Sequence, residues 1–258
     1  MTAATPENPS TGGSGIPRSL MATAIAAVVL IVLSFAAQTL LKYEIVQVNP
    51  LFVGNVTTGV DVSNHQGEVD MRALADQGVQ FVYVKATEGA SFVDEYFDEN
   101  WSAAKAAGIP RGAYHFFSFD TPGADQAASF IATVGPLEGD LIPVVDVEWY
   151  KDKKNNPPAK EDLVRELGEY LDALEAEYGV KPMIYSTGAL YNDYIADAFG
   201  AYPRWVRSVS LPAWLYVDRY TLWQYSSRGK LDGSTGHEQY FDMNALNPAV
   251  TLEQLTVG

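Results

Sequence analysis

Two carboxylic acids, Asp146 and Glu148, lie two residues apart in the apolar run 142–149. If this run is a strand, both acids point to one face and Val145 and Val147 point to the other, because side chains alternate along a strand. Two acids held close in a partly dry pocket repel one another, so the pKa of one rises and that group stays protonated. Such a pair can cleave a glycosidic bond. The alternative is an exposed edge strand with solvated acids, and apolar residues on both faces of the run argue against it.

Two further acids occupy comparable places in the chain. Asp61 lies at the end of the apolar segment 59–63, and Asp242 lies within residues 240–244. Asp61 alone is equally compatible with a structural role. If all four acids point inward, much of the negative charge gathers in one cleft. The candidate catalytic residues are therefore Glu148, Asp146, Asp61 and Asp242.

Aromatic and amide side chains on other apolar runs could contact a sugar. Aromatic faces stack on sugar rings, although most aromatic residues on strands belong to a core. A polar side chain inside an apolar strand, such as Lys85, needs a hydrogen-bond partner in the protein or in a ligand. The candidate substrate-binding residues are Tyr114, Tyr185, Trp205 and Gln224.

Other chemistries have little support. The chain has no cysteine, which excludes a disulfide framework, a thiolate metal site and a cysteine nucleophile. The three histidines are isolated in the sequence and are expected to form hydrogen bonds rather than bind metal. The sequence has neither a phosphate-binding glycine motif nor a Gly-x-Ser-x-Gly motif. We expect no metal and no cofactor, although spacing alone leaves a metal-dependent carboxylate site open.

The elements that must position these residues are strands alternating with helices. The clearest helix is 158–178, with apolar residues at helical spacing between Pro158 and Gly179. Repeated strand and helix units favour an α/β barrel, whose chemistry lies at the C-terminal strand ends. Residues after Pro203 have strand signals without a convincing helix, so we expect the barrel to be irregular there. The candidate strands are 59–63, 81–86, 112–117, 142–148, 182–186, 204–207 and 221–225.

The amino-acid composition excludes some classes of protein. The 258 residues are 47% hydrophobic and 19% charged, which is typical of a globular chain and excludes disorder. The formal net charge is -15, and such an acidic protein repels phosphate backbones. Nucleic acid is therefore not an expected partner.

The first 41 residues differ from the rest. Residues 1–18 are rich in Pro, Gly, Ser and Thr and are expected to form a flexible tail. Residues 19–41 have no charge and lie between Arg18 and Lys42. A helix of that length reaches ~35 Å, enough to cross a bilayer core of ~30 Å, so we predict a transmembrane anchor. A cleaved signal peptide or a buried core helix are the alternatives.

Several motifs, in this order, resemble glycoside hydrolase family 25, the Chalaropsis-type lysozymes. These enzymes cleave between N-acetylmuramic acid and N-acetylglucosamine in peptidoglycan. The resemblance covers residues 59 to about 246, almost the whole globular part, and the order of the motifs makes it specific. The motifs are GVDVS at 59–63, FVYVKATEG at 81–89, GAYHF at 112–116, VDVE at 145–148, MIYS at 183–186, WQY at 223–225 and DMN at 242–244.

The resemblance implies a modified barrel of about eight strands with fewer helices. It makes Glu148 the general acid and has Asp146 assist the developing positive charge or orient the substrate's acetamido group. Asp61 and Asp242 would line the cleft. Two departures put the preferred substrate length in doubt: Arg207 stands where many members have a small residue, and the segment 208–220 is short.

We therefore expect a membrane-anchored muramidase that is a monomer. Its parts would be a tail (1–18), a transmembrane anchor (19–41), a linker (42–58) and a catalytic barrel (59–250) outside the cytoplasm. Its partners would be peptidoglycan glycan strands and, through residues 19–41, a membrane, with secretion after signal cleavage as the alternative. A chitinase-like hydrolase is disfavoured because the longer acidic signature is absent before Asp146. A non-catalytic peptidoglycan-binding module is disfavoured because all four acids are present.

Overall fold

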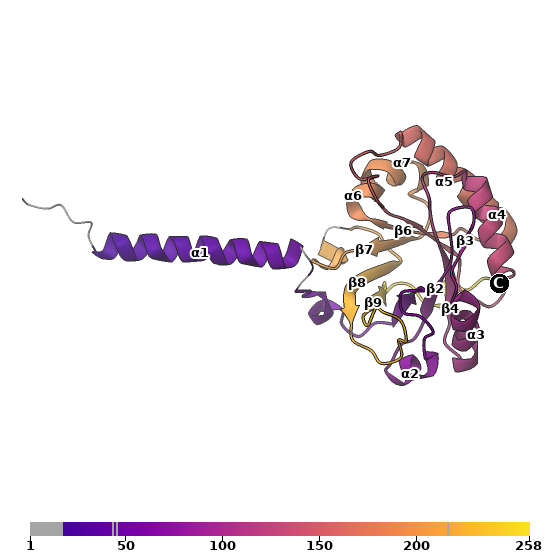
Figure 1. Ribbon diagram of the computed structural model, residues 1–258, viewed down its shortest axis with the longest axis horizontal. Coiled ribbons are helices and arrows are strands. Elements are labelled where there is room, and N and C mark those ends of the chain that lie inside the picture. The colour runs from indigo at the N-terminus through magenta and orange to yellow at the C-terminus, as the bar shows by residue number, and fades with distance from the viewer. Residues whose placement is uncertain (1–17, 43, 45, 216) are drawn as a thin grey trace, which may run out of the picture. The chain divides into compact units, whose positions relative to one another are not determined.

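The computed structural model describes residues 18–42, 44, 46–215 and 217–258 (Figure 1). The chain divides into two compact units, Met1–Val46 and Gln47–Gly258. In the first unit, helix α1 (Arg18–Lys42) is apolar on all sides, and Ser19–Leu40 has the length and composition to cross a membrane. No other described helix meets these criteria. The predicted tail lies outside the described residues, apart from Arg18.

In the second unit, eight of the described strands close into a barrel, which confirms the predicted fold. Neighbouring strands run parallel from β1 to β8. The last strand, β9, runs antiparallel to both β8 and β1 and closes the barrel. A ninth strand, β3 (Phe92–Val93), pairs with the end of β2 outside the closed ring. The barrel strands are β1 (Thr58–Val62), β2 (Val82–Glu88), β4 (Arg111–Phe116), β5 (Val144–Val147), β6 (Met183–Thr187), β7 (Arg204–Arg207), β8 (Leu222–Gly229) and β9 (Phe241–Leu246).

Long helices cover only part of the barrel (Figure 1). The predicted helix at 158–178 is present as α5 (Lys160–Tyr178), which ends at Gly179 in the left-handed conformation with φ of 68°. After Pro203 the helical segments of the described chain are only short 3-10 turns, as expected for a barrel that is irregular there. The elements are α2 (Met71–Asp76), α3 (Phe97–Ala107), α4 (Gly123–Val134), α6 (Gly188–Leu190), the π turn η2 (Tyr191–Ile195), α7 (Ala196–Phe199) and the 3-10 turns η1 (Asn49–Phe52), η3 (Ala213–Leu215) and η4 (Glu253–Leu255).

Aromatic rings fill the barrel interior. The fully buried ring of Tyr83 on β2 lies 5.1 Å from the ring of Trp205 on β7. The ring of Tyr185 lies 5.2 Å from Trp205 on its other side. Gly112 on β4 gives Tyr83 its space, because a Cβ there would lie 2.2 Å from the tyrosine ring. The cleft described below therefore has a rigid aromatic floor.

Part of the segment predicted as a linker packs on the barrel. Asn49, at the start of η1, is buried, and its Nδ2 donates hydrogen bonds to the carbonyl oxygens of Ser208 and Tyr225. Gln47 exchanges hydrogen bonds with Ser226 and Ser227 at the end of β8. These polar contacts leave no hydrophobic periodicity in the sequence, so no packed element was predicted from the pattern of this segment.

Candidate active site

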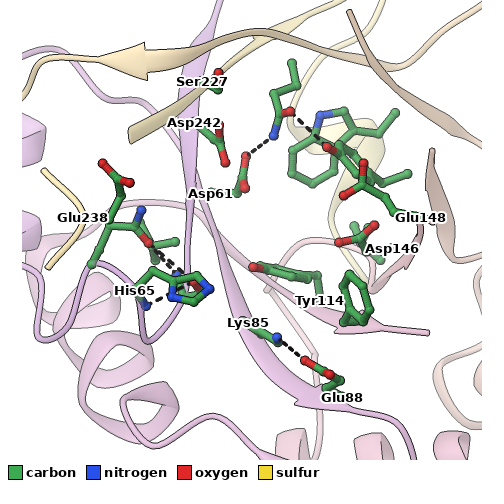
Figure 2. A pocket seen from close by; sticks show the side chains of 18 of the residues that line it. Asp61, His65, Lys85, Glu88, Tyr114, Asp146, Glu148, Ser227, Glu238 and Asp242 are labelled. Atoms are coloured by element: carbon green, nitrogen blue, oxygen red, sulfur yellow. Dashed lines mark hydrogen bonds and ion pairs between the residues drawn. The ribbon is translucent and has the colours of Figure 1, made fainter. Parts of the chain in front are cut away.

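All eight candidate residues line one cleft of about 530 Å³ at the C-terminal ends of the parallel strands. Asp61 and Asp242 come from β1 and β9, where they lie directly opposite each other in the antiparallel register. Asp146 comes from β5, and Glu148 follows the end of that strand. Figure 2 shows Asp61 and Asp242 on one side of the cleft and Asp146 and Glu148 on another. The cleft thus combines acids from three elements.

The β5 segment positions its acids by strand alternation. Val145 and Val147 are fully buried, whereas Asp146 is partly exposed and lines the cleft, as does Glu148. After Glu148 the chain is held by Trp149, whose ring lies 5.5 Å from that of Phe119 and 5.4 Å from that of Tyr194. This aromatic packing fixes the point at which the chain leaves the strand.

Electrostatics near Asp146 favour a protonated acid. Burial raises the pKa of Asp146 well above its ordinary value, and the negative charges of Glu148 and Asp61 raise it further. The ammonium group of Lys85 opposes this increase in the pKa. The Oδ1 atom of Asp146 is buried without a hydrogen-bond partner in the described structure. A ligand group entering the cleft could supply that missing partner.

Asp61 is held by amide side chains. Its Oδ2 accepts hydrogen bonds from Asn244 Nδ2 at 2.7 Å and from Gln224 Nε2 at 3.1 Å. Burial nevertheless raises the pKa of Asp61 to about 6, although both amides and the charge of Arg207 act to lower it. Asp61 is therefore a carboxyl group that titrates near neutral pH.

A second layer of hydrogen bonds orients those amides. Tyr185 Oη donates to Gln224 Oε1 at 2.9 Å, which turns the NH₂ group of Gln224 toward Asp61. Trp205 Nε1 donates to Asn244 Oδ1 at 2.9 Å and does the same for Asn244. Three of the candidate substrate-binding residues, Tyr185, Trp205 and Gln224, are thus buried and engaged with the protein.

Tyr114 differs from those three residues. It is only partly buried, and Figure 2 shows its ring between the two groups of acids. Burial and the surrounding carboxylates raise the pKa of its hydroxyl well above the ordinary value, so the hydroxyl stays protonated. Tyr114 can therefore present both a ring face and a hydrogen-bond donor to a ligand.

Some residues of the site were not among the predicted site residues. Asn244 was noted only within the DMN motif, because its segment 241–246 lacks the apolar strand pattern that singled out Gln224. Lys85 pairs with Glu88 at 2.7 Å, and its ammonium group lies 5.2 Å from the centre of the Phe116 ring. His65 and Glu238 line the side of the cleft away from Asp146 and Glu148 (Figure 2). Neither was predicted from the sequence as a site residue. Among the described residues, no three His, Cys, Asp or Glu side chains form a group that could hold a metal ion.

The comparisons with known proteins agree on one family. The model of glycosyl hydrolases family 25 matches residues 60–234. The uncharacterised protein YegX of Escherichia coli K12 is 37% identical over 209 residues, covering 76% of this chain and 71% of that protein. The N,O-diacetylmuramidase of Chalaropsis sp is 32% identical over 136 residues, covering 50% of this chain and 64% of the enzyme. A solved family 25 glycosyl hydrolase from Bacillus anthracis is 43% identical with a TM-score of 0.69, covering 74% of this chain and 90% of that one.

Proposed function

Because the chain belongs to family 25 of the glycosyl hydrolases, and is therefore a glycoside hydrolase, we propose that it is a muramidase acting on peptidoglycan. It would hydrolyse the bond between N-acetylmuramic acid and N-acetylglucosamine. One observation carries the proposal: Asp146 and Glu148 line a deep cleft together with Asp61 and Asp242. The name of the Chalaropsis relative, an N,O-diacetylmuramidase, supports the choice of substrate.

In the proposed reaction, Glu148 is the general acid. It donates a proton to the glycosidic oxygen as the bond from that oxygen to the anomeric carbon breaks. Positive charge then develops at the anomeric carbon, and water finally adds there and returns a proton to the site. Burial and the negative charges of Glu148 and Asp61 raise the pKa of Asp146, so the pair of acids retains a proton at a pH at which a free carboxyl group is ionised. The choice of Glu148 as the residue that donates the proton follows from the resemblance to family 25.

Asp146 would act on the substrate's acetamido group. Its buried Oδ1 lacks a partner in the described structure and is therefore available to bind the acetamido N–H or a hydroxyl. Held in this way, the acetamido oxygen could approach the anomeric carbon as a nucleophile, which is one of the known routes of glycoside hydrolysis. Asp61 and Asp242 would line the cleft near the developing positive charge, and Tyr114 would contact the sugar.

The domain division and location belong to the same proposal. Residues 1–18 would be a tail, 19–41 a transmembrane anchor, 42–58 a linker and 59–250 the catalytic barrel, placed outside the cytoplasm where peptidoglycan lies. The charge-free stretch Ser19–Leu40 of α1, which is not buried in the structure, supports an anchor, and a cleaved signal peptide is the alternative. Mass spectrometry of the N-terminus and protease treatment of intact spheroplasts distinguish the two: an anchor predicts a full-length, membrane-bound chain whose barrel is digested.

Analysis of the reaction products tests the substrate assignment. The purified full-length protein is incubated with peptidoglycan, and the fragments are reduced with borohydride and identified by mass spectrometry. The proposal predicts new reducing ends on N-acetylmuramic acid. Reducing ends on N-acetylglucosamine would contradict the muramidase assignment, and intact glycan strands that retain bound protein would favour the binding-module alternative.

A further inference from the structure

Two charge-free segments lie on the barrel beside β7 and β8. Residues 47–57 and 208–215 contain no Asp, Glu, Lys or Arg, in a chain whose net charge is -15. The first segment contains η1 and the second contains η3. Five large apolar side chains on these segments are at least half exposed, and we call them the apolar face: Leu51 (82%), Phe52 (51%), Leu211 (53%), Trp214 (52%) and Leu215 (58%).

The two segments are held next to each other. Asn49 Nδ2 of η1 donates a hydrogen bond to the carbonyl oxygen of Ser208 at 2.6 Å. Val53, which follows η1, packs against the buried cluster that contains Ala213 and Val217. The two segments that carry the exposed side chains are therefore neighbours on the barrel.

The chemistry of this face fits a lipid interface. Leucine, phenylalanine and tryptophan without neighbouring charge are typical of surfaces that insert into the headgroup region of a bilayer. A bound glycan needs polar partners, yet none of the described residues in 47–57 or 208–215 lines the catalytic cleft. A second copy of so acidic a chain would be repelled by the first.

We propose that the apolar face docks on the membrane that residues 19–41 are proposed to cross, so this inference depends on that anchoring. Only residues 43–48 separate α1 from η1 in the sequence. Seven Cα–Cα steps join Lys42 to Asn49, and at no more than ~3.6 Å each they limit the distance between the end of α1 and the start of η1 to about 25 Å. Because the anchor and η1 are so close along the chain, the anchored barrel already lies near the membrane. Docking therefore requires little further loss of its translational and rotational entropy.

Docking would also affect the cleft. Gln47, just before η1, is hydrogen-bonded to Ser226 and Ser227, and Ser227 lines the cleft. A membrane held at the apolar face therefore keeps the β8 rim of the cleft close to the headgroups. The docked enzyme would favour glycan strands that lie at the membrane surface.

Fluorescence quenching by brominated lipids tests the docking. All five tryptophans lie in the barrel unit, and Trp214 is the only one classed as exposed among these described residues. The full-length protein is reconstituted into phosphatidylcholine vesicles with bromine on the acyl chains near the headgroups.

We expect clear quenching of the wild type and at least a threefold smaller quenched fraction for Trp214→Phe. The double variant Leu51→Glu with Leu215→Glu, which keeps Trp214, should lose at least half of the quenching. Val93→Glu, at an exposed apolar residue of β3, is the matched control and should leave the quenching unchanged.

Equal quenching of the wild type and Trp214→Phe, or none in either protein, would overturn the docking. So would a change in Trp214 emission with soluble peptidoglycan fragments but not with lipid, which would assign the face to glycan. The same preparations are assayed for peptidoglycan hydrolysis. Hydrolysis without quenching refutes only the docking, and quenching without hydrolysis refutes only the proposed muramidase activity.

Discussion

Asp61 shows which of two opposing effects dominates at a single residue. Two amides donate to its Oδ2, which favours the ionised form, but burial outweighs them and places the pKa at about 6 against an ordinary value of 3.8. Below pH 3.8 the group is protonated in both the folded and the unfolded chain and makes no difference to stability. Between pH 3.8 and about 6 the unfolded chain releases this proton while the folded chain keeps it, so the free energy of unfolding falls, by roughly 3 kcal/mol in total. Above pH 6 the folded chain holds the buried charge and the loss is complete.

Replacing this carboxyl group should therefore stabilise the fold while harming its function. Asp61→Asn keeps the shape and an acceptor oxygen but removes the buried charge. We expect its melting temperature to exceed that of the wild type at pH 7, with the difference vanishing near pH 3.5, and we expect hydrolysis to fall. Thermal unfolding followed at both pH values measures this. A melting temperature at pH 7 equal to or below that of the wild type would contradict the sign of the effect.

The sequence predicts that a side chain faces the cleft when the alternation along its own strand decides this. The alternation of Val145, Asp146, Val147 and Glu148 was enough to bring both acids to the cleft. The role of Asn244 could not be found in that way, because its contact with Asp61 crosses from β9 to β1. That contact exists only when β9 runs antiparallel and closes the barrel.

Strand β9 is an element that the periodic pattern of the sequence did not predict. The βα repeats predicted a parallel sheet, and the barrel strands from β1 to β8 follow that prediction. The segment 230–240 is shorter than the dozen or more residues that a parallel crossover requires, so β9 returns antiparallel. Its mixed sequence, Phe241–Leu246, lacks clean alternation, and no strand was predicted there.

Two glycines on different elements should respond to alanine in opposite ways. On β4, Gly112→Ala forces a Cβ to within 2.2 Å of the Tyr83 ring, and overpacking of this kind costs ~1–3 kcal/mol. On α5, Gly168→Ala meets Phe199 at an ordinary 3.5 Å and should stabilise the helix by up to ~1 kcal/mol. Urea unfolding of both variants measures the free energies. A Gly112→Ala protein as stable as the wild type would show that Tyr83 does not fill the barrel floor tightly.

At the scale of the whole molecule, negative charge should govern the encounter with the wall. Only Glu7 and Arg18 are charged before Lys42, so the entire net charge of -15 falls on the rest of the chain. Peptidoglycan fragments that retain their peptide carboxylates are also anionic, and salt screens repulsion beyond a Debye length of ~8 Å at 0.15 M. We expect KM for such fragments to fall severalfold between 10 mM and 150 mM salt while kcat changes little. A KM that rises with salt would indicate an attractive encounter instead.

In the proposed reaction Glu148 protonates the leaving oxygen in the cleft, and the substitution Glu148→Gln removes that proton. Glutamine keeps the size and polarity of the side chain but cannot supply the proton. The measurement is kcat for the release of reducing ends from peptidoglycan, together with wall binding by co-sedimentation, for the wild type, Glu148→Gln and the control Glu99→Gln on α3, outside the cleft. We predict that Glu148→Gln lowers kcat at least ~100-fold and still binds the wall, while the control stays within about twofold of the wild type. Hydrolysis by Glu148→Gln at a rate near that of the wild type would contradict the account.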